Sequence, residues 1–388
     1  MKAPLRTRWG AAVLLACSSL AWAAPPDGGL TQLQARMAGK TPGTEGSTIL
    51  LPQPAADHRA TLTQLLAAPL SADAAVRVAL LNNPTLQATL GGEGLAVTDA
   101  MGADSPAKLR AQQAITVLSA QTYQAWVNAV AAARSAQLLR DAKATAEASG
   151  ELMRRMVQAG NVSKLAQAHS QAALSDAALA LVRAEQQAFA AREALTVLLG
   201  LWGAQAAQYT LPTALPELPA QALELPDVEA RALAARSDLQ LATETWYRKQ
   251  QASVPDSADA LWDALGDAAR VRAQAVQLRS QARLAYHRYR SSWDIAHHLE
   301  SAVLPLRQFI HDEQVLRYNG MLTSLFDVLA DSQTRTLAAH ATVQAQRDFW
   351  LAHTRLQALL AGAPLDALGG DGGDSPGEAR TPTPTGGH

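Results

Sequence analysis

The chain has 388 residues, of which 48% are hydrophobic and only 5% are aromatic, and alanine dominates its composition. This balance suits closely packed helices better than a β-sandwich. The formal net charge of −1 leaves no basic surplus, so the sequence gives no sign of a nucleic-acid partner.

Residues 1–23 have the features of an export signal. A basic start and a mostly apolar run precede the sequence AWA at 21–23, which fits the small-x-small pattern of a cleavage site. The chain's one cysteine, Cys17, lies in this segment. It is either a small apolar residue that is discarded with the signal, or the cysteine of a lipobox, which would become the lipidated N-terminus of the mature chain. In both cases the mature chain contains no disulfide.

Residues 24–70 are rich in proline, glycine, threonine and glutamine, and we expect a loose N-terminal segment there. Residues 71–90 predict a short helix that begins at Ser71 as its N-cap, and Pro84 marks a turn or helix junction. No later run of about 20 uncharged apolar residues follows the signal, so the sequence predicts no transmembrane helix.

A long helix is predicted next. Residues 107–159 contain no proline and one glycine, and a continuous helix of that length would span about 80 Å, which is typical of coiled-coil packing. Gly160-Asn161 interrupts the pattern. A return helix with Ser163 as its N-cap then runs to Leu199.

The same plan repeats after a proline-rich crossing at 201–228. A second short helix matches the first, and a second long helical pattern covers residues 268–318, with a kink expected at Pro305. Asn319-Gly320 interrupts this pattern as Gly160-Asn161 does the first one.

We interpret Gly160 and Gly320 as equivalent tips of two duplicated hairpins. Glycine adopts positive φ without penalty, so each glycine is expected to cap one helix and reverse the chain. Thr323 is the expected N-cap of the second return helix, which runs to residue 360. The predicted organisation is a signal peptide at 1–23, a loose segment at 24–70, a first helical repeat at 71–200, a crossing at 201–228, a second helical repeat at 229–362 and a disordered tail at 363–388.

Several segments resemble the TolC-like family of outer membrane efflux proteins. AAVRVALLNNPTLQA and ARALAARSDLQLA resemble the short helices of that family, and MVQAGNVSKLAQA and LRYNGMLTSLFDVLADSQT resemble its two hairpin tips. VLPLR and QRDFWLAHTRLQALL look most like a branch associated with heavy-metal, especially copper, resistance. The resemblance covers most of residues 70–362.

The resemblance implies a homotrimer in which each protomer gives two helical repeats to a periplasmic tunnel and strands to a shared outer-membrane barrel. The hairpin tips would receive a periplasmic adaptor protein, which links to an inner-membrane pump. The adaptor-binding residues implied by position are Gly160, Asn161, Val162, Ser163, Asn319, Gly320, Met321, Leu322 and Thr323.

One feature departs from the family. Its two strands after each short helix have no counterpart here, because no ten-residue stretch alternates apolar and polar residues in those places. We therefore expect an all-α fold of duplicated long antiparallel hairpins with the barrel strands largely missing, and at most short strands near 91–105 and 250–262. Such a protein would lie at the outer membrane or its periplasmic face without spanning the membrane alone, with soluble periplasm as the alternative.

Motifs for catalysis are not found. The sequence has no nucleophile elbow, phosphate-binding loop, dinucleotide fingerprint or HExxH motif, so we expect neither enzyme activity nor a cofactor. Two groups, His297–His298–Glu300 and His311–Asp312–Glu313, could be imagined as metal ligands. Consecutive helical residues point in different directions, which favours solvated helix faces over metal sites.

The leading hypothesis is a channel component of a tripartite efflux system, with heavy metals as the candidate cargo. The alternative is a soluble periplasmic helical scaffold derived from the same family, without channel activity. Trp126, Trp293 and Trp350 are interpreted as packing residues.

Overall fold

The computed structural model describes residues 30–39, 41–43, 49–52, 58–92, 106–252 and 257–368. Every regular element in these ranges is a helix, and they contain no strand. The predicted all-α fold is therefore confirmed. The predicted signal peptide with Cys17, most of the residues at which short strands were expected (93–105 and 253–256) and residues 369–388 of the predicted tail lie outside the described residues. The expectation of disorder is wrong for residues 363–368, because Leu365–Leu368 form a short helix and Ala363 and Leu368 are buried.

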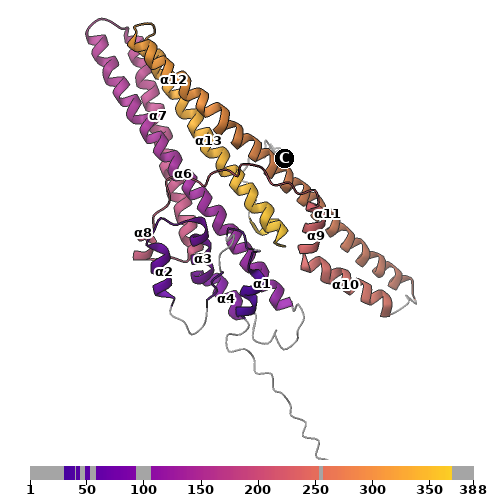
Figure 1. Ribbon diagram of the computed structural model, residues 1–388. Coiled ribbons are helices and arrows are strands. Elements are labelled where there is room, and N and C mark those ends of the chain that lie inside the picture. Colours follow the sequence, from indigo (N-terminus) through magenta and orange to yellow (C-terminus); the bar gives the residue numbers. More distant parts are fainter. Residues whose placement is uncertain are drawn as a thin grey trace, which may run out of the picture.

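Four long helical segments run side by side, and shorter helices gather near one end of them (Figure 1). The first half of the chain forms α1 (Leu30–Met37), α2 (Arg59–Leu66), α3 (Ala72–Asn82), α4 (Pro84–Gly92), α6 (Pro106–Gln158), α7 (Lys164–Leu199) and α8 (Ala204–Gln208). The second half forms α9 (Val228–Ala235), α10 (Ser237–Ala252), α11 (Ala258–His298), η2 (Leu299–Val303), α12 (Leu304–Asn319), α13 (Leu325–Leu360) and η3 (Leu365–Leu368). None of these helices is both long and apolar enough to cross a bilayer.

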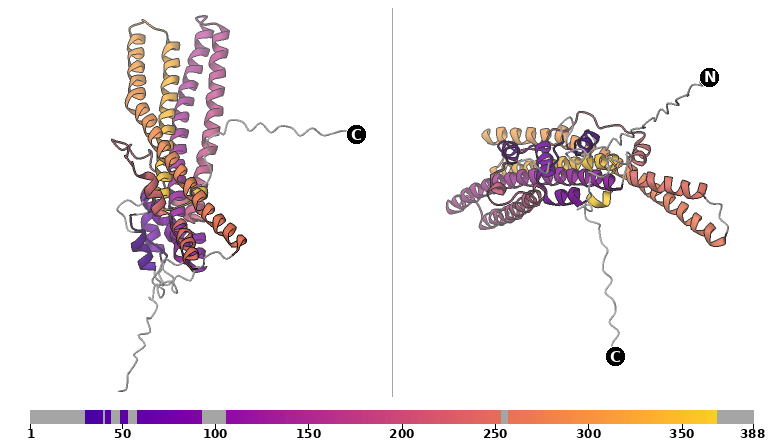
Figure 2. Two further views of the ribbon diagram at one scale, coloured as in Figure 1. Left: turned by 90° about the vertical axis from the view of Figure 1, so that its right-hand side faces the viewer. Right: turned by 90° about the horizontal axis from the view of Figure 1, so that it is seen from below.

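Each half of the chain contains one long antiparallel hairpin. Helix α6 pairs with α7, and α13 pairs with the helical run of α11, η2 and α12. Because α6 also packs against α13, the long helices lie in the order α7, α6, α13, α12 (Figure 2). This is the duplicated hairpin arrangement that the sequence predicted, and α7 and α12 are the edges of the layer.

Part of the N-terminal segment that we expected to be loose is helical and packed. Leu30, Leu33 and Met37 of α1 are buried, and so are Ile49 and Leu51 in the extended stretch that follows. The three α1 residues are spaced by three and four, which is the period of a buried helix face. The abundance of proline and glycine around them obscures that short pattern.

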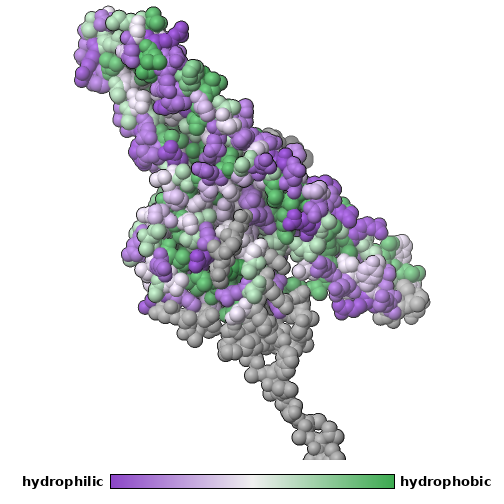
Figure 3. Space-filling view, viewed as in Figure 1, coloured by the Kyte–Doolittle hydropathy of each residue, from purple (hydrophilic) through white to green (hydrophobic). Residues whose placement is uncertain are grey.

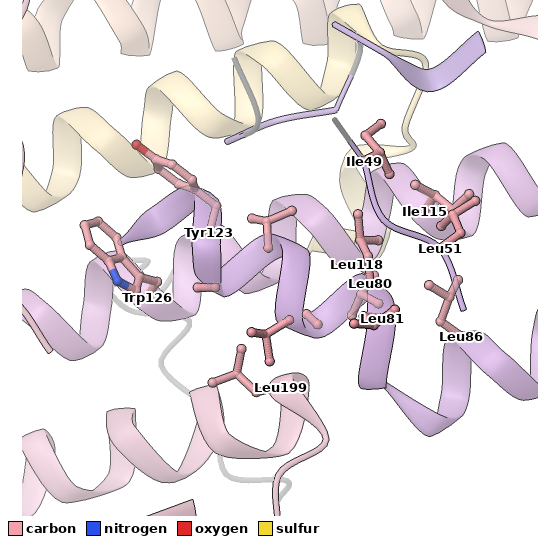
Figure 4. Close-up of a cluster of buried hydrophobic side chains, with 14 of the residues drawn as sticks. Ile49, Leu51, Leu80, Leu81, Leu86, Ile115, Leu118, Tyr123, Trp126 and Leu199 are labelled. Atoms are coloured by element: carbon pink, nitrogen blue, oxygen red, sulfur yellow. The ribbon is translucent and has the colours of Figure 1, made fainter. Parts of the chain in front are cut away.

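A first hydrophobic core fills the base of the first hairpin, where α3 packs against α6 and the end of α7 (Figure 4). Trp126 lies in this core, and its indole N–H donates a 2.7 Å hydrogen bond to the carbonyl of Leu70. The labelled members in Figure 4 are Ile49, Leu51, Leu80, Leu81, Leu86, Ile115, Leu118, Tyr123, Trp126 and Leu199.

A second core lies at the corresponding place in the other half, between α9, α11 and α13. Its aromatic residues also hold the proline-rich crossing. The Tyr289 hydroxyl accepts a bond from the N–H of Leu223 at 2.8 Å. The indole N–H groups of Trp293 and Trp350 donate to backbone carbonyls of the crossing at 2.9 and 3.2 Å. The tryptophans therefore bind the part of the crossing that lies beyond α8 and has no regular structure, as well as packing in the cores.

The helical run passes Pro305 without ending. Proline lacks an N–H and its ring crowds the preceding turn of an α-helix. Here the π-turn η2 directly precedes α12, whose second residue is Pro305. A π-turn holds one extra residue and gives the ring room. The disturbance expected at this proline therefore takes the form of a local widening.

Candidate functional site

The far end of the first hairpin is closed by a tight glycine turn. Gly160 has a φ of +77°, and its N–H donates to the carbonyl of Val157 at 3.0 Å. The N–H of Asn161 reaches the carbonyl of Met156 at 2.9 Å. This pair of bonds is the Schellman pattern that satisfies the last carbonyls of a helix. Ser163 then caps α7 with its hydroxyl oxygen, as the sequence predicted.

The second hairpin uses the same cap, but one residue later than predicted. Gly320 has an ordinary φ of −82°, and the positive φ of 57° belongs to Met321. The N–H of Met321 donates to the carbonyl of Tyr318 at 2.9 Å, and that of Leu322 donates to the carbonyl of Arg317 at 2.8 Å. The expectation that Gly320 adopts positive φ is wrong, because the helix continues one residue further before it is capped.

The N-cap of the second return helix shifts in the same way. The Ser324 hydroxyl oxygen accepts a bond from the N–H of Asp327 at 3.2 Å, and the Asp327 carboxylate accepts one from the N–H of Ser324 at 3.1 Å. This is a capping box. Thr323, which we expected to be the cap, donates its hydroxyl to the same carboxylate at 2.9 Å. The Ser324 hydroxyl also donates to this carboxylate, at 2.7 Å, and that bond is the largest cause of the lowered pKa of Asp327, followed by the bond from Thr323.

Equivalent positions of the two tips differ in chemistry. Gly160 corresponds to Met321, since both are the left-handed residue of the cap. The Met321 side chain is 93% exposed and Leu322 beside it is also exposed. A residue other than glycine at positive φ costs about 1–2 kcal/mol, and such strain tends to occur at functional sites. The second tip thus presents exposed apolar side chains on a strained turn.

The structure brings all nine predicted tip residues to one end of the molecule, where the ends of both hairpins lie together (Figures 1 and 2). Asn319 is the last residue of α12, and Val162, in the turn between α6 and α7, is half-buried.

A groove of about 410 Å³ lies between the two hairpins and reaches the tips. It is lined by α6, α7 and α13, and most of its lining residues are alanine, serine or threonine. Its larger side chains are Met153, His169, Phe326, Leu329 and Gln333. Small residues on facing helices leave this space open, and an apolar groove between helices suits a partner helix. Sequence reasoning missed the groove because its walls come from three separated helices.

The two histidine groups that the sequence drew attention to have ordinary neighbours. His311 lies 3.1 Å from the Asp331 carboxylate, across the α12–α13 hairpin. The ring of His297 stacks on Trp293 with centroids 4.7 Å apart. Within the described ranges, no three His, Cys, Asp or Glu side chains gather closely enough to hold a metal ion. Asp331 could not be identified from sequence, because it lies on the opposite helix.

Both edge helices expose apolar side chains. On α7, Val182 and Phe189 are seven residues apart; on α12, Phe309 and Leu316 have the same spacing. Phe189 is 67% exposed and Phe309 is 61% exposed. Such spacing is typical of a seam between packed helices. Figure 3 shows hydrophobic side chains among hydrophilic ones along the length of the long helices. In the described chain, the long helix beside α7 is α6, and that beside α12 is α13.

Several solved structures of membrane proteins are similar to this chain. The outer membrane channel CmeC of Campylobacter jejuni has a TM-score of 0.53 at 13% sequence identity, over 76% of this chain and 68% of CmeC. A membrane protein from Pseudomonas aeruginosa has a TM-score of 0.51 at 16% identity, over 75% of this chain and 72% of its own. CusC, described for its transmembrane channel formation, has a TM-score of 0.50 at 14% identity, over 75% of this chain and 96% of its own.

At these identities the likeness shows a shared fold. No protein-family model and no curated protein matches the sequence. The helical hairpin fold that the resemblance implied is confirmed, because the structures of the outer membrane channels CmeC and CusC share it at 13% and 14% sequence identity.

Proposed function

We propose that the chain is a TolC-like outer membrane factor and supplies the periplasmic helical tunnel of a tripartite efflux system. In this role it binds a periplasmic adaptor protein and, through it, an inner-membrane pump, and it catalyses no reaction itself. The fold shared with the outer membrane channels CmeC and CusC supports this role. The observation that supports it most directly is the pair of unpartnered apolar edges on α7 and α12.

These edges suit assembly into a ring. A layer whose two edges are different, and each unpartnered, can place α7 of one copy against α12 of the next. Such a head-to-tail contact either closes into a ring or continues as a filament. The family resemblance gives three copies, so the proposed assembly is a homotrimer with its helices around a tunnel. It lies at the outer membrane, with its hairpin tips in the periplasm.

The tips are the proposed adaptor contact. Met321 and Leu322 are exposed apolar residues at the very end of the second hairpin, and the lining of the groove between the hairpins begins at Phe326, four residues beyond Leu322. A helix of the adaptor would bury Met321 and enter the groove with its apolar face, as amphipathic helices do in other apolar grooves.

Heavy-metal ions are the proposed cargo. The proposal rests on residues 303–307 and 346–360, which resemble the metal-resistance branch of the family. Deletion of the gene should then sensitise cells to copper more than to organic toxicants. An equal sensitivity to both would contradict this cargo.

The assembly is tested by light scattering of the purified protein. We expect a trimer for the wild type and a monomer for Phe189→Glu and Phe309→Glu, because each places a charge in the proposed seam. Met321→Ser is the matched control: it should leave the trimer intact and weaken capture of the adaptor. A wild-type monomer at micromolar concentration, recovered only from the soluble periplasmic fraction, would instead identify a scaffold without channel activity.

A further inference from the structure

The short hairpin formed by α10 and the first turns of α11 projects away from the layer of long helices (Figures 1 and 2). It lies at the opposite end of the molecule from the tips. Leu278 is the first buried residue of α11, and before it only Val271 and Ala275 pack against the second core, so residues 258–270 contribute nothing to that core. The hairpin is therefore available to bind something outside the chain.

One face of this hairpin is apolar and uncovered. Leu261, Trp262 and Leu265 are spaced by one, three and four residues on α11, which groups them on one side of the helix. All three are exposed, Trp262 by 70%, and Tyr247 of α10 is exposed as well. Burying a side chain of this size is worth about 1.5–3 kcal/mol, so this face has a strong tendency to be covered.

The same face continues along α11 as a row of arginines. Arg272 and Arg279 follow Leu265 at intervals of seven residues, and Arg283 comes four residues later. Between Asp267 and Asp294 the sequence has six arginines and no acidic residue. Arg283 is paired with Glu229 at 3.0 Å, whereas Arg272 and Arg279 make no ion pair within the described ranges.

The acidic residues of α11 lie on a different side. Asp259, Asp263 and Asp267 are spaced by four residues, and their row is turned away from that of Leu261 and Leu265 by roughly half a turn of the helix. Asp267 is bonded to Lys249 of α10 at 2.9 Å. Negative charge is thus kept off the apolar and basic face, which complements an anionic surface.

We propose that this face of the α10–α11 hairpin binds a lipid surface with anionic headgroups. Tryptophan, tyrosine and leucine at the hairpin end match the boundary between headgroups and acyl chains, where aromatic residues concentrate. Arginines further along the same face match the phosphate layer. A seam between two protein helices would keep apolar residues along its whole length. Beyond Leu265 this face carries mainly arginines, with Val276 as an exposed apolar residue between Arg272 and Arg279, and this mainly basic stretch favours a lipid over a second copy.

This lipid contact goes beyond the proposed efflux function, since it requires neither adaptor nor cargo. It is tested by co-sedimentation of protein, purified after expression of the whole chain, with two kinds of vesicle. One contains phosphatidylcholine and phosphatidylglycerol in equal parts, and the other contains phosphatidylcholine alone. We expect binding to the anionic vesicles, and much weaker binding to the neutral ones.

Two variants separate the apolar and basic parts of the face. Trp262→Ser should weaken binding about tenfold, because a partly buried tryptophan is lost. The double variant Arg272→Gln with Arg279→Gln should weaken it about tenfold or more at low salt, and the difference should shrink at high salt. Circular dichroism should show unchanged helix content, since all three residues are exposed.

Matched controls come from the same chain. Trp202→Ser removes another tryptophan, 81% exposed, just beyond α7. The double variant Arg154→Gln with Arg155→Gln removes two exposed arginines near the first tip. Both controls should bind like the wild type. The proposal is overturned if the wild type ignores both vesicles or if the controls lose as much binding as the test variants. It also fails if Trp262→Ser changes the oligomeric mass and leaves vesicle binding intact.

Discussion

At the base of each repeat, the return helix ends in the same way, with a glycine packed against the backbone of a short helix. Gly200 after α7 and Gly362 after α13 both have positive φ, and each lies against the carbonyl of a residue at the end of the preceding short helix, Asn82 or Ala235. A Cβ on either glycine would clash with that carbonyl. The duplicated fold has therefore kept a close backbone contact in both halves.

The side chains around this contact have diverged. In the first repeat the amides of Asn82 and Asn83 donate to the last two carbonyls of α7 and to that of Gly200, at 2.8–3.0 Å. In the second repeat, Arg236 follows the short helix and pairs with Asp238 at 2.6 Å. The hydrogen bond from Arg236 is the largest cause of the lowered pKa of Asp238. Side-chain amides thus reinforce the first junction, whereas the second depends more on its glycine contact.

The largest expected effect is loss of either junction glycine. Gly200→Ala and Gly362→Ala should each destabilise the protein by about 3 kcal/mol or more, because positive φ and a backbone clash act together. Gly160→Ala is the control, since its φ is positive but no atom lies near its Cβ position; it should cost only about 1 kcal/mol. Denaturant unfolding measures all three. Equal values for the three variants would contradict the clash.

The next effect distinguishes the two junctions. Asn83 is buried, and besides its amide bond its side-chain oxygen accepts from the N–H of Leu86 at 3.0 Å. Asn83→Ala should therefore cost about 2 kcal/mol by leaving buried polar groups unpaired. Arg236→Ala should cost less than about 1 kcal/mol, because its partner Asp238 is largely exposed. Thermal unfolding measures both variants. A larger loss of stability for Arg236→Ala than for Asn83→Ala would contradict the comparison.

The tips should differ in their response to pH. Ser163→Ala and Ser324→Ala should each cost about 1 kcal/mol at neutral pH through loss of an N-cap. Asp327 has a lowered pKa, so its contribution is complete above the ordinary carboxyl pKa and is lost as pH falls through the lowered value. The cost of Ser324→Ala should therefore shrink in acid, while that of Ser163→Ala stays constant. Unfolding curves at several acidic pH values test this. If the destabilisation by both substitutions shrank equally as the pH fell, the prediction would be contradicted.

The smallest effect concerns the shifted cap. Met321→Gly should stabilise the protein by about 0.5–1 kcal/mol by relieving positive φ, a gain reduced by the flexibility of glycine in the unfolded chain. Gly320→Ala should be close to neutral, because Gly320 has an ordinary φ and no atom nearer than 3.6 Å to its Cβ position. Melting temperatures should rise for the first variant and hardly move for the second. If Gly320→Ala lowered the melting temperature and Met321→Gly left it unchanged, Gly320 would be the residue with positive φ after all.

The long helices and their order along the chain could be predicted from the sequence, because both depend on local signals. Helical composition over 107–159, the break at Gly160 and the cap at Ser163 are all readable without tertiary information. The cap at Met321 was missed because the sequence Asn319-Gly320 offers a better turn than the one that forms. In the structure the positive φ lies one residue later, at Met321, and Ser324 and Asp327 form a capping box directly after it. The groove beside the tips could not be predicted either, since its walls meet only after folding.

The π-turn at Leu299–Val303 has a consequence for the phase of the long helix. One additional residue rotates everything beyond it by about 100° relative to an unbroken α-helix. The direction in which Phe309 and Leu316 point is therefore set by this turn as much as by their own positions. Deleting a single residue there would leave α12 helical but swing its apolar stripe off the edge of the layer. The π-turn that accommodates Pro305 thus also sets the direction of the apolar stripe of α12, up to several turns away.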